Sequence, residues 1–163
     1  MEPWSVLALI AGVASTFIGF TGVIFALGRS SREGWNPAER TALINLLMPS
    51  LVVLFLALLP IVAGTGIDST ELIWRGANGL LAAIHLVLVT TAFRAALRKT
   101  LMEPVPLRWV LIPGGYASGI LSALAAFGLF PRFWVMLFLA GLVWSLFIAA
   151  IQFVMLIVPR PAA

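Results

Sequence analysis

The chain has 163 residues, of which 62% are hydrophobic and only 10% are charged, and its mean hydropathy is +1.11. A water-soluble domain of this size would aggregate with so apolar a composition, so the sequence predicts an integral membrane protein. The net charge of +4 does not indicate nucleic-acid binding, because most basic residues lie at the ends of apolar segments, where they face lipid headgroups. The absence of cysteine excludes disulfide bonds and thiolate chemistry.

Charged residues divide the chain into five long uncharged segments, at positions 3–28, 41–67, 76–93, 109–131 and 133–159. Each segment reaches or nearly reaches the roughly 20 apolar residues that cross a hydrocarbon core of about 30 Å. We therefore expect an all-α, polytopic membrane protein with a single domain, a compact bundle of five transmembrane helices. The expected helices cover residues 4–28, 38–66, 71–98, 108–130 and 132–158, approximately.

The basic residues are distributed unevenly between the two sides of this bundle. One side holds Arg29, Arg32, Arg40, Arg94, Arg98, Lys99, Arg108 and Arg160, and the other holds Arg75 and Arg132. By the positive-inside rule we expect the N-terminus outside and the C-terminus in the cytoplasm, in the inner membrane of a bacterium. The first four residues contain no basic residue, so we interpret the first apolar segment as a retained span and not a cleaved signal.

Several charged residues are predicted to anchor the third helix in the membrane. Arg75 follows Glu71 by four residues, the favourable order for an ion pair on one helix, and should anchor the outer end. Arg94, Arg98 and Lys99 should face anionic headgroups at the inner end. Membrane lipids are thus the first expected partners.

Local signals in the second helix and in the loop after it predict a kink and a helix start. Pro49 removes a backbone hydrogen bond, which frees the carbonyl of Asn45 and either lines a cavity or produces an ordinary proline bend. The sequence Asp-Ser-Thr-Glu at 68–71 has the form of a capping box, with Asp68 as the N-cap of the third helix.

Two helices carry stripes of small residues at helical spacing. The first helix has Ala8, Gly12, Ser15, Gly19, Gly22 and Ala26, and the fourth has Gly115, Ser118, Ser122 and Ala125. In lipid, helices associate through close van der Waals contact, so we expect both stripes to be helix-packing faces. For the first helix we expect a seam inside the protein, and the alternative is a seam between copies of an oligomer.

The third helix carries the most distinctive polar residues. Arg75, Asn78, Ala82 and His85 are spaced 3, 4 and 3 residues apart and therefore share one helical face. His85 is the only histidine in the chain, and it lies roughly 15 Å inward from Arg75, near the bilayer midplane. An ionisable residue at this depth is a candidate functional residue.

Three roles for His85 remain open at this stage. It is either a neutral histidine bonded to a polar group on a neighbouring helix, part of a proton or ion path, or a metal or haem ligand. A lone histidine without cysteine cannot build a metal site within one chain, so we expect no metal and no cofactor. No nucleotide-binding or hydrolase motif is present, and we do not expect an enzyme.

We expect a homo-oligomeric channel or small transporter. Its polar path is predicted to use His85, Asn78, Gln152, Tyr116 and Asn45. The alternative is a non-transporting accessory or assembly subunit of a larger membrane complex, because the chain is small, lacks soluble domains and has basic loops. A third, weaker hypothesis is an intramembrane enzyme or cofactor carrier.

Overall fold

The computed structural model describes residues 2–29, 37–98 and 105–157, with side chains for 2–27, 43–98 and 109–155. These residues form five α-helices and one short 3-10 helix: α1 (Pro3–Arg29), α2 (Pro37–Ala63), α3 (Thr70–Leu97), α4 (Val105–Ala126), η1 (Pro131–Phe133) and α5 (Trp134–Ile157). All five α-helices contain a stretch long and apolar enough to cross a membrane. The all-helical class and the five apolar helices predicted from the sequence are confirmed.

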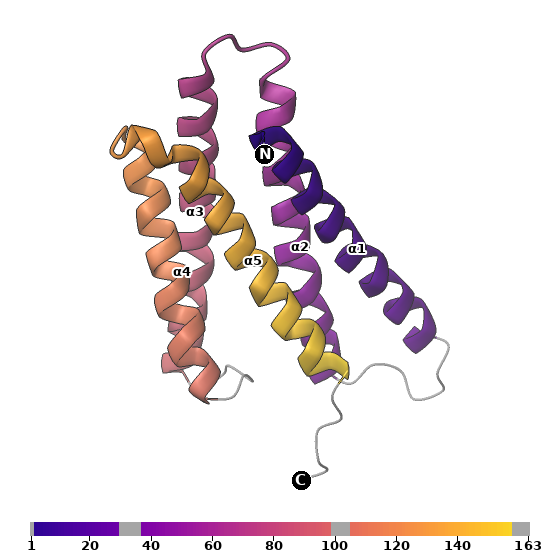
Figure 1. Ribbon diagram of the computed structural model, residues 1–163. Helices are drawn as coiled ribbons and strands as arrows, with labels where there is room; N and C mark the ends of the chain where they lie inside the picture. The colour runs from indigo at the N-terminus through magenta and orange to yellow at the C-terminus, as the bar shows by residue number, and fades with distance from the viewer. Residues whose placement is uncertain (1, 30–36, 99–104, 158–163) are drawn as a thin grey trace.

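The helices pack as two antiparallel pairs with α5 between them (Figure 1). One pair is α1 and α2, and the other is α3 and α4. Helix α5 contacts α2, α4 and α3, and thus joins the two pairs. We call the end of the bundle where α3 begins and α4 ends the Trp74 end, and the opposite end the Arg94 end.

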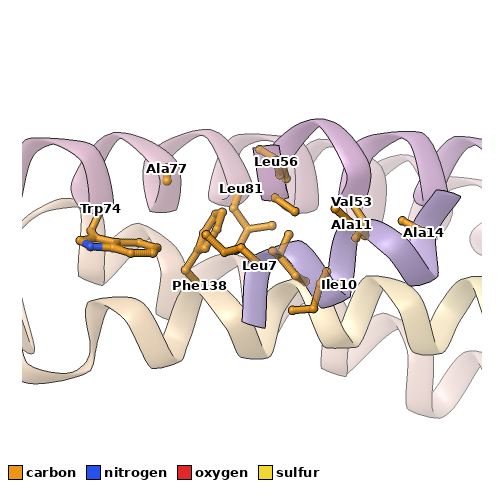
Figure 2. Close-up of a cluster of buried hydrophobic side chains, with 12 residues drawn as sticks. Leu7, Ile10, Ala11, Ala14, Val53, Leu56, Trp74, Ala77, Leu81 and Phe138 are labelled. Atoms are coloured by element: carbon orange, nitrogen blue, oxygen red, sulfur yellow. The ribbon is translucent and has the colours of Figure 1, made fainter. Parts of the chain in front are cut away.

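A cluster of buried apolar side chains joins four of the helices near the Trp74 end (Figure 2). Leu7, Leu56, Leu81 and Phe138 are fully buried and come from α1, α2, α3 and α5. The indole of Trp74 stacks on Trp4, with ring centroids 5.6 Å apart, and meets the edge of Phe138 at 5.9 Å. These large side chains fix the relative positions of the two helix pairs.

The small-residue stripe of α1 does not face the other helices, so the expected internal seam is wrong for the described residues. Gly12, Gly19 and Gly22 have no atom of another helix within 4 Å of the position a Cβ would take, and Ser15 is exposed. The buried face of α1 is displaced from the stripe by one residue, about 100° around the helix. It consists of Leu7, Ile10, Ala11, Ala14 and Thr21.

The small residues of α4 and α5, by contrast, allow α3, α4 and α5 to approach closely. A Cβ at Gly115 would lie 3.0 Å from Val89, and one at Gly119 would lie 2.9 Å from Leu86. On α5, a Cβ at Gly141 would lie 2.6 Å from Leu81. Backbones this close bring short side chains on three helices within direct hydrogen-bonding distance.

The ends of two helices differ from the expectation. The N-cap of α3 is Ser69 and not Asp68, because the Ser69 hydroxyl accepts a hydrogen bond from the Leu72 amide at 3.3 Å. Helix α4 ends at Ala126, before residue 130, because Gly128 has a φ of +90° and ends the helical geometry. Phe130, with a φ of +60°, then leads into η1.

Candidate functional site

His85 of α3 lies between α4 and α5 and is hydrogen-bonded to both. Its Nδ1 atom is 2.9 Å from the Oγ of Ser118 on α4, and its Nε2 atom is 2.7 Å from the Oγ of Ser145 on α5. The side chain is only 6% exposed. The three residues, here called the His85 cluster, therefore connect three helices through one imidazole ring.

The hydroxyl of Ser145 has one hydrogen, and two acceptors lie within its reach: the carbonyl of Gly141 at 3.2 Å and Nε2 of His85 at 2.7 Å. The tautomer of the ring depends on which of the two this hydrogen binds. When the hydroxyl donates to Gly141, its oxygen accepts from His85, and the ring proton lies on Nε2. Nδ1 is then left as an acceptor, so the Ser118 hydroxyl donates to it. In this state the bonds run in one direction, from Ser118 through His85 to Ser145.

Helical spacing explains how each member of the cluster reaches this point. Asn78, Ala82 and His85 are all buried, as expected for residues that share one face of α3. Ser145 lies four residues after Gly141, whose missing side chain lets α5 approach Leu81 of α3. Ser118 comes from the small-residue face of α4, where Gly119 lies against the Cβ of His85.

Asn78 lies two helical turns from His85 toward the Trp74 end and is fully buried. Its Nδ2 group donates to the carbonyl of Trp74 at 2.9 Å and to the carbonyl of Trp134 on α5 at 3.0 Å. Its Oδ1 atom has no hydrogen-bond partner among the described residues. A buried amide oxygen in this state costs free energy and is a typical position for an internal water.

Ser122 lies between Asn78 and the His85 cluster along the α3–α4 interface. This position follows from the antiparallel register, in which His85 meets Ser118 and Gly79 faces Ala126. The Ser122 side chain is 1% exposed, and its hydroxyl also has no partner in the part of the chain that the structure describes.

Further polar groups continue the series toward the Arg94 end. The indole ring of Trp144 lies against Gly114, and its Nε1 atom is buried without a partner among the described residues. The hydroxyls of Tyr116 and Thr90 are 3.4 Å apart. We call the complete series the polar row: Asn78, Ser122, Ser118, His85, Ser145, Trp144, Thr90 and Tyr116. From Asn78 to Thr90 it extends about 18 Å along α3, at 1.5 Å per residue.

The structure places the remaining predicted path residues differently. Gln152 is buried on α5, on the same helical face as Ser145 and two turns nearer the Arg94 end. Asn45 is exposed on α2, a helix that packs mainly against α1 and α5 and contacts α3 less, so we leave it outside the polar row. Helix α2 continues through Pro49, and the next residue, Ser50, donates its hydroxyl back to the Leu46 carbonyl.

Arg75 connects α3 to the end of α4. Its Nη1 atom forms the predicted ion pair with Glu71 at 3.1 Å. Its Nε atom also donates to the carbonyl of Ala126 at 3.0 Å, so Arg75 satisfies a carbonyl at the C-terminus of α4. Arg94 and Arg98 are exposed at the other end of α3, and Lys99 lies outside the described residues.

Sequence reasoning recognised His85 but not its partners. It placed His85 in a polar path with Asn78, Gln152, Tyr116 and Asn45, and it assigned Ser118 to a helix-packing face. The short hydroxyls of Ser118 and Ser145 reach the ring because glycines bring the helices close. A comparison of depths in the membrane would have identified Ser145. Ser145 lies 14 residues after Pro131, where η1 leads into α5, and His85 lies 15 residues after Thr70, where α3 begins.

The His85 cluster has the order of nucleophile, base and orienting group that is known from serine hydrolases. Such an enzyme also needs free backbone N–H groups that bind an oxyanion. The amides around Ser118 and Ser145 lie inside α4 and α5, where helical hydrogen bonds occupy them. Among the described residues, no three His, Asp or Glu side chains come together to hold a metal ion. The geometry therefore favours proton exchange between fixed groups over acyl transfer.

Comparisons of the chain with models of known protein families, with curated proteins and with solved structures find no match.

Proposed function

We propose that this protein is a membrane transport protein, a small channel or transporter, and that a small polar or charged species moves along the polar row. One observation carries this proposal: His85, midway along α3, is bonded through both ring nitrogens to hydroxyls on two other helices. Polar groups within a membrane are costly, and a row of them along one helix interface is typical of transport paths. Three buried polar atoms without partners along this row support hydration of the path.

In this proposal the Trp74 end faces the outside and the Arg94 end faces the cytoplasm of a bacterial cell. The support is the excess of arginine and lysine in the loops at the Arg94 end. We also propose that the protein forms homo-oligomers. The support for this is the small-residue face of α1, which the other helices of the same chain leave uncovered.

Flux measurements in proteoliposomes test the transport function. The wild-type protein is expected to conduct protons or small ions, and His85→Ala should abolish most of that flux. Ser50→Ala is the matched control, because Ser50 is also buried but donates its hydroxyl back to Leu46 of its own helix, α2. Absence of flux in the wild type, or unchanged flux in a folded His85→Ala protein, would refute the proposal.

A second candidate function is that of an accessory subunit in a larger membrane assembly. The observation that favours it is again the uncovered face of α1, which would suit a helix of another protein as well as a second copy. Purification in a mild detergent distinguishes the two functions. A stable homo-oligomer without a co-purifying protein contradicts the accessory function.

A further inference from the structure

We infer that the species carried along the polar row is the proton, and that it passes through His85 from Ser118 to Ser145 or in the reverse direction. This inference rests on the transport function proposed above and specifies its substrate. It is derived from the direct contacts within the His85 cluster and from the close approach of the three helices around it.

The packing around the His85 cluster leaves no position for a metal cation or a solute. The ring nitrogens bond directly to the two hydroxyls, at 2.9 and 2.7 Å, and not through an intervening ligand. A Cβ at Gly141 would lie 2.6 Å from Leu81 and 3.1 Å from the Ser118 hydroxyl, so α5 already touches both α3 and α4. An ion needs several oxygen ligands around it, whereas a proton needs only an unbroken series of hydrogen bonds.

The directed hydrogen bonds define the transfer step. A proton that arrives at the Ser118 oxygen is bound there while the original hydroxyl proton moves to Nδ1 of His85. The Ser145 hydroxyl turns from the Gly141 carbonyl to an internal water, the proton on Nε2 moves to the Ser145 oxygen, and the original hydroxyl proton of Ser145 leaves to that water. One proton enters and one leaves. Both serine oxygens again carry one hydrogen, and the single ring proton has moved from Nε2 to Nδ1. Rotation of the ring and of both hydroxyls restores the initial tautomer.

The buried polar atoms without partners extend this relay toward both ends. Ser122 Oγ and Asn78 Oδ1 lie on the side of the Trp74 end, and Trp144 Nε1 lies on the side of the Arg94 end. All three belong to residues at the α3–α4–α5 interface, and internal waters bound to them would donate and accept hydrogen bonds. The Thr90 and Tyr116 hydroxyls lie nearer the Arg94 end, at the contact between α3 and α4.

The test uses the full chain in proteoliposomes that contain a pH-sensitive dye, with a potassium diffusion potential as the driving force. We expect proton flux that is slower in D₂O than in H₂O, and no flux of Na⁺ or Cl⁻. Ser118→Ala and Ser145→Ala should lower the proton flux by about two orders of magnitude, since each removes a proton-transfer group. Ser118→Thr and Ser145→Thr keep the hydroxyl and should retain most of the flux, and Ser50→Ala should not change it.

The possible outcomes separate this inference from the transport function itself. Flux of Na⁺ or Cl⁻ without proton flux would overturn the proton relay and leave transport intact, whereas absence of all flux would contradict both. Two of the measurements, ion selectivity and the solvent isotope effect, need only the wild-type protein and do not depend on the folding of a variant. Nitrogen NMR of His85 in lipid should show a protonated Nε2 and an unprotonated Nδ1, and the reverse assignment would contradict the direction of the resting hydrogen bonds.

Discussion

The indole ring of Trp144 on α5 lies against Gly114 on α4, in the space that a Cβ at position 114 would occupy. The obstacle is a large ring held at the helix interface, so it cannot turn aside as a flexible side chain would. We predict that Gly114→Ala destabilises the protein by about 1–3 kcal/mol, the usual cost of overpacking a core. Thermal unfolding in detergent, followed by tryptophan fluorescence, measures this change.

Gly76→Ala is the matched control for this substitution. Gly76 lies on α3, is exposed and has no atom within 4 Å of a Cβ position. Alanine favours helix over glycine, so this variant should be as stable as the wild type or more stable. Equal loss of stability in both variants would show that the contact with Trp144 is not the cause.

The hydrogen bond between His85 and Ser145 should give a measurable coupling energy. In a double-mutant cycle with His85→Ala and Ser145→Ala, we expect a coupling of about 0.6–1.7 kcal/mol, which lies between the average and the maximum found for hydrogen bonds between membrane helices. A second cycle with His85→Ala and Ser50→Ala should give a coupling near zero, because Ser50 lies on α2 and bonds to Leu46. Equal coupling in the two cycles would contradict a direct bond.

Most of the fold follows from residue types at fixed spacing along the chain. Five uncharged segments predict five helices, because a backbone in lipid must satisfy its own hydrogen bonds. The shared face of Asn78 and His85 follows from the period of the helix and is confirmed by their burial. These features depend only on local geometry, which the sequence specifies directly.

The neighbours of each face could not be predicted in the same way. Two faces of α1, one with Gly12 and one with Ala11, are equally suited to close packing, and only the second is covered. In lipid, apolar side chains give no preference for one face, so the choice depends on which neighbour fits best. The partners of His85 were missed for the same reason, since Ser118 and Ser145 become neighbours only when three helices assemble.

The two bonds of Arg75 should contribute unequally to stability. The Glu71 carboxylate is on an exposed side chain, so Glu71→Gln should cost less than about 1 kcal/mol. The bond from Nε to the Ala126 carbonyl holds the end of α4 against α3, and Arg75→Lys, which keeps the charge but lacks this N–H, should cost about 1–3 kcal/mol. Hydrogen exchange of the last turn of α4 should also become faster in Arg75→Lys. Exchange that is faster in Glu71→Gln than in Arg75→Lys would contradict the larger contribution of the bond to Ala126.

A substitution on the uncovered face of α1 should impair assembly without affecting folding. Gly19 has nothing within 4 Å of its Cβ position, so Gly19→Leu should leave the thermal stability of a single chain in detergent unchanged. If two copies meet at this face, the leucine prevents the close backbone approach on which their association depends. Energy transfer between labelled copies in bilayers should then fall toward the level of non-interacting chains. Val13→Leu changes an exposed position of α1 that lies about 120° around the helix from Gly19, and it should leave the energy transfer unchanged. Undiminished transfer in Gly19→Leu would show that any homo-oligomer forms through a different face.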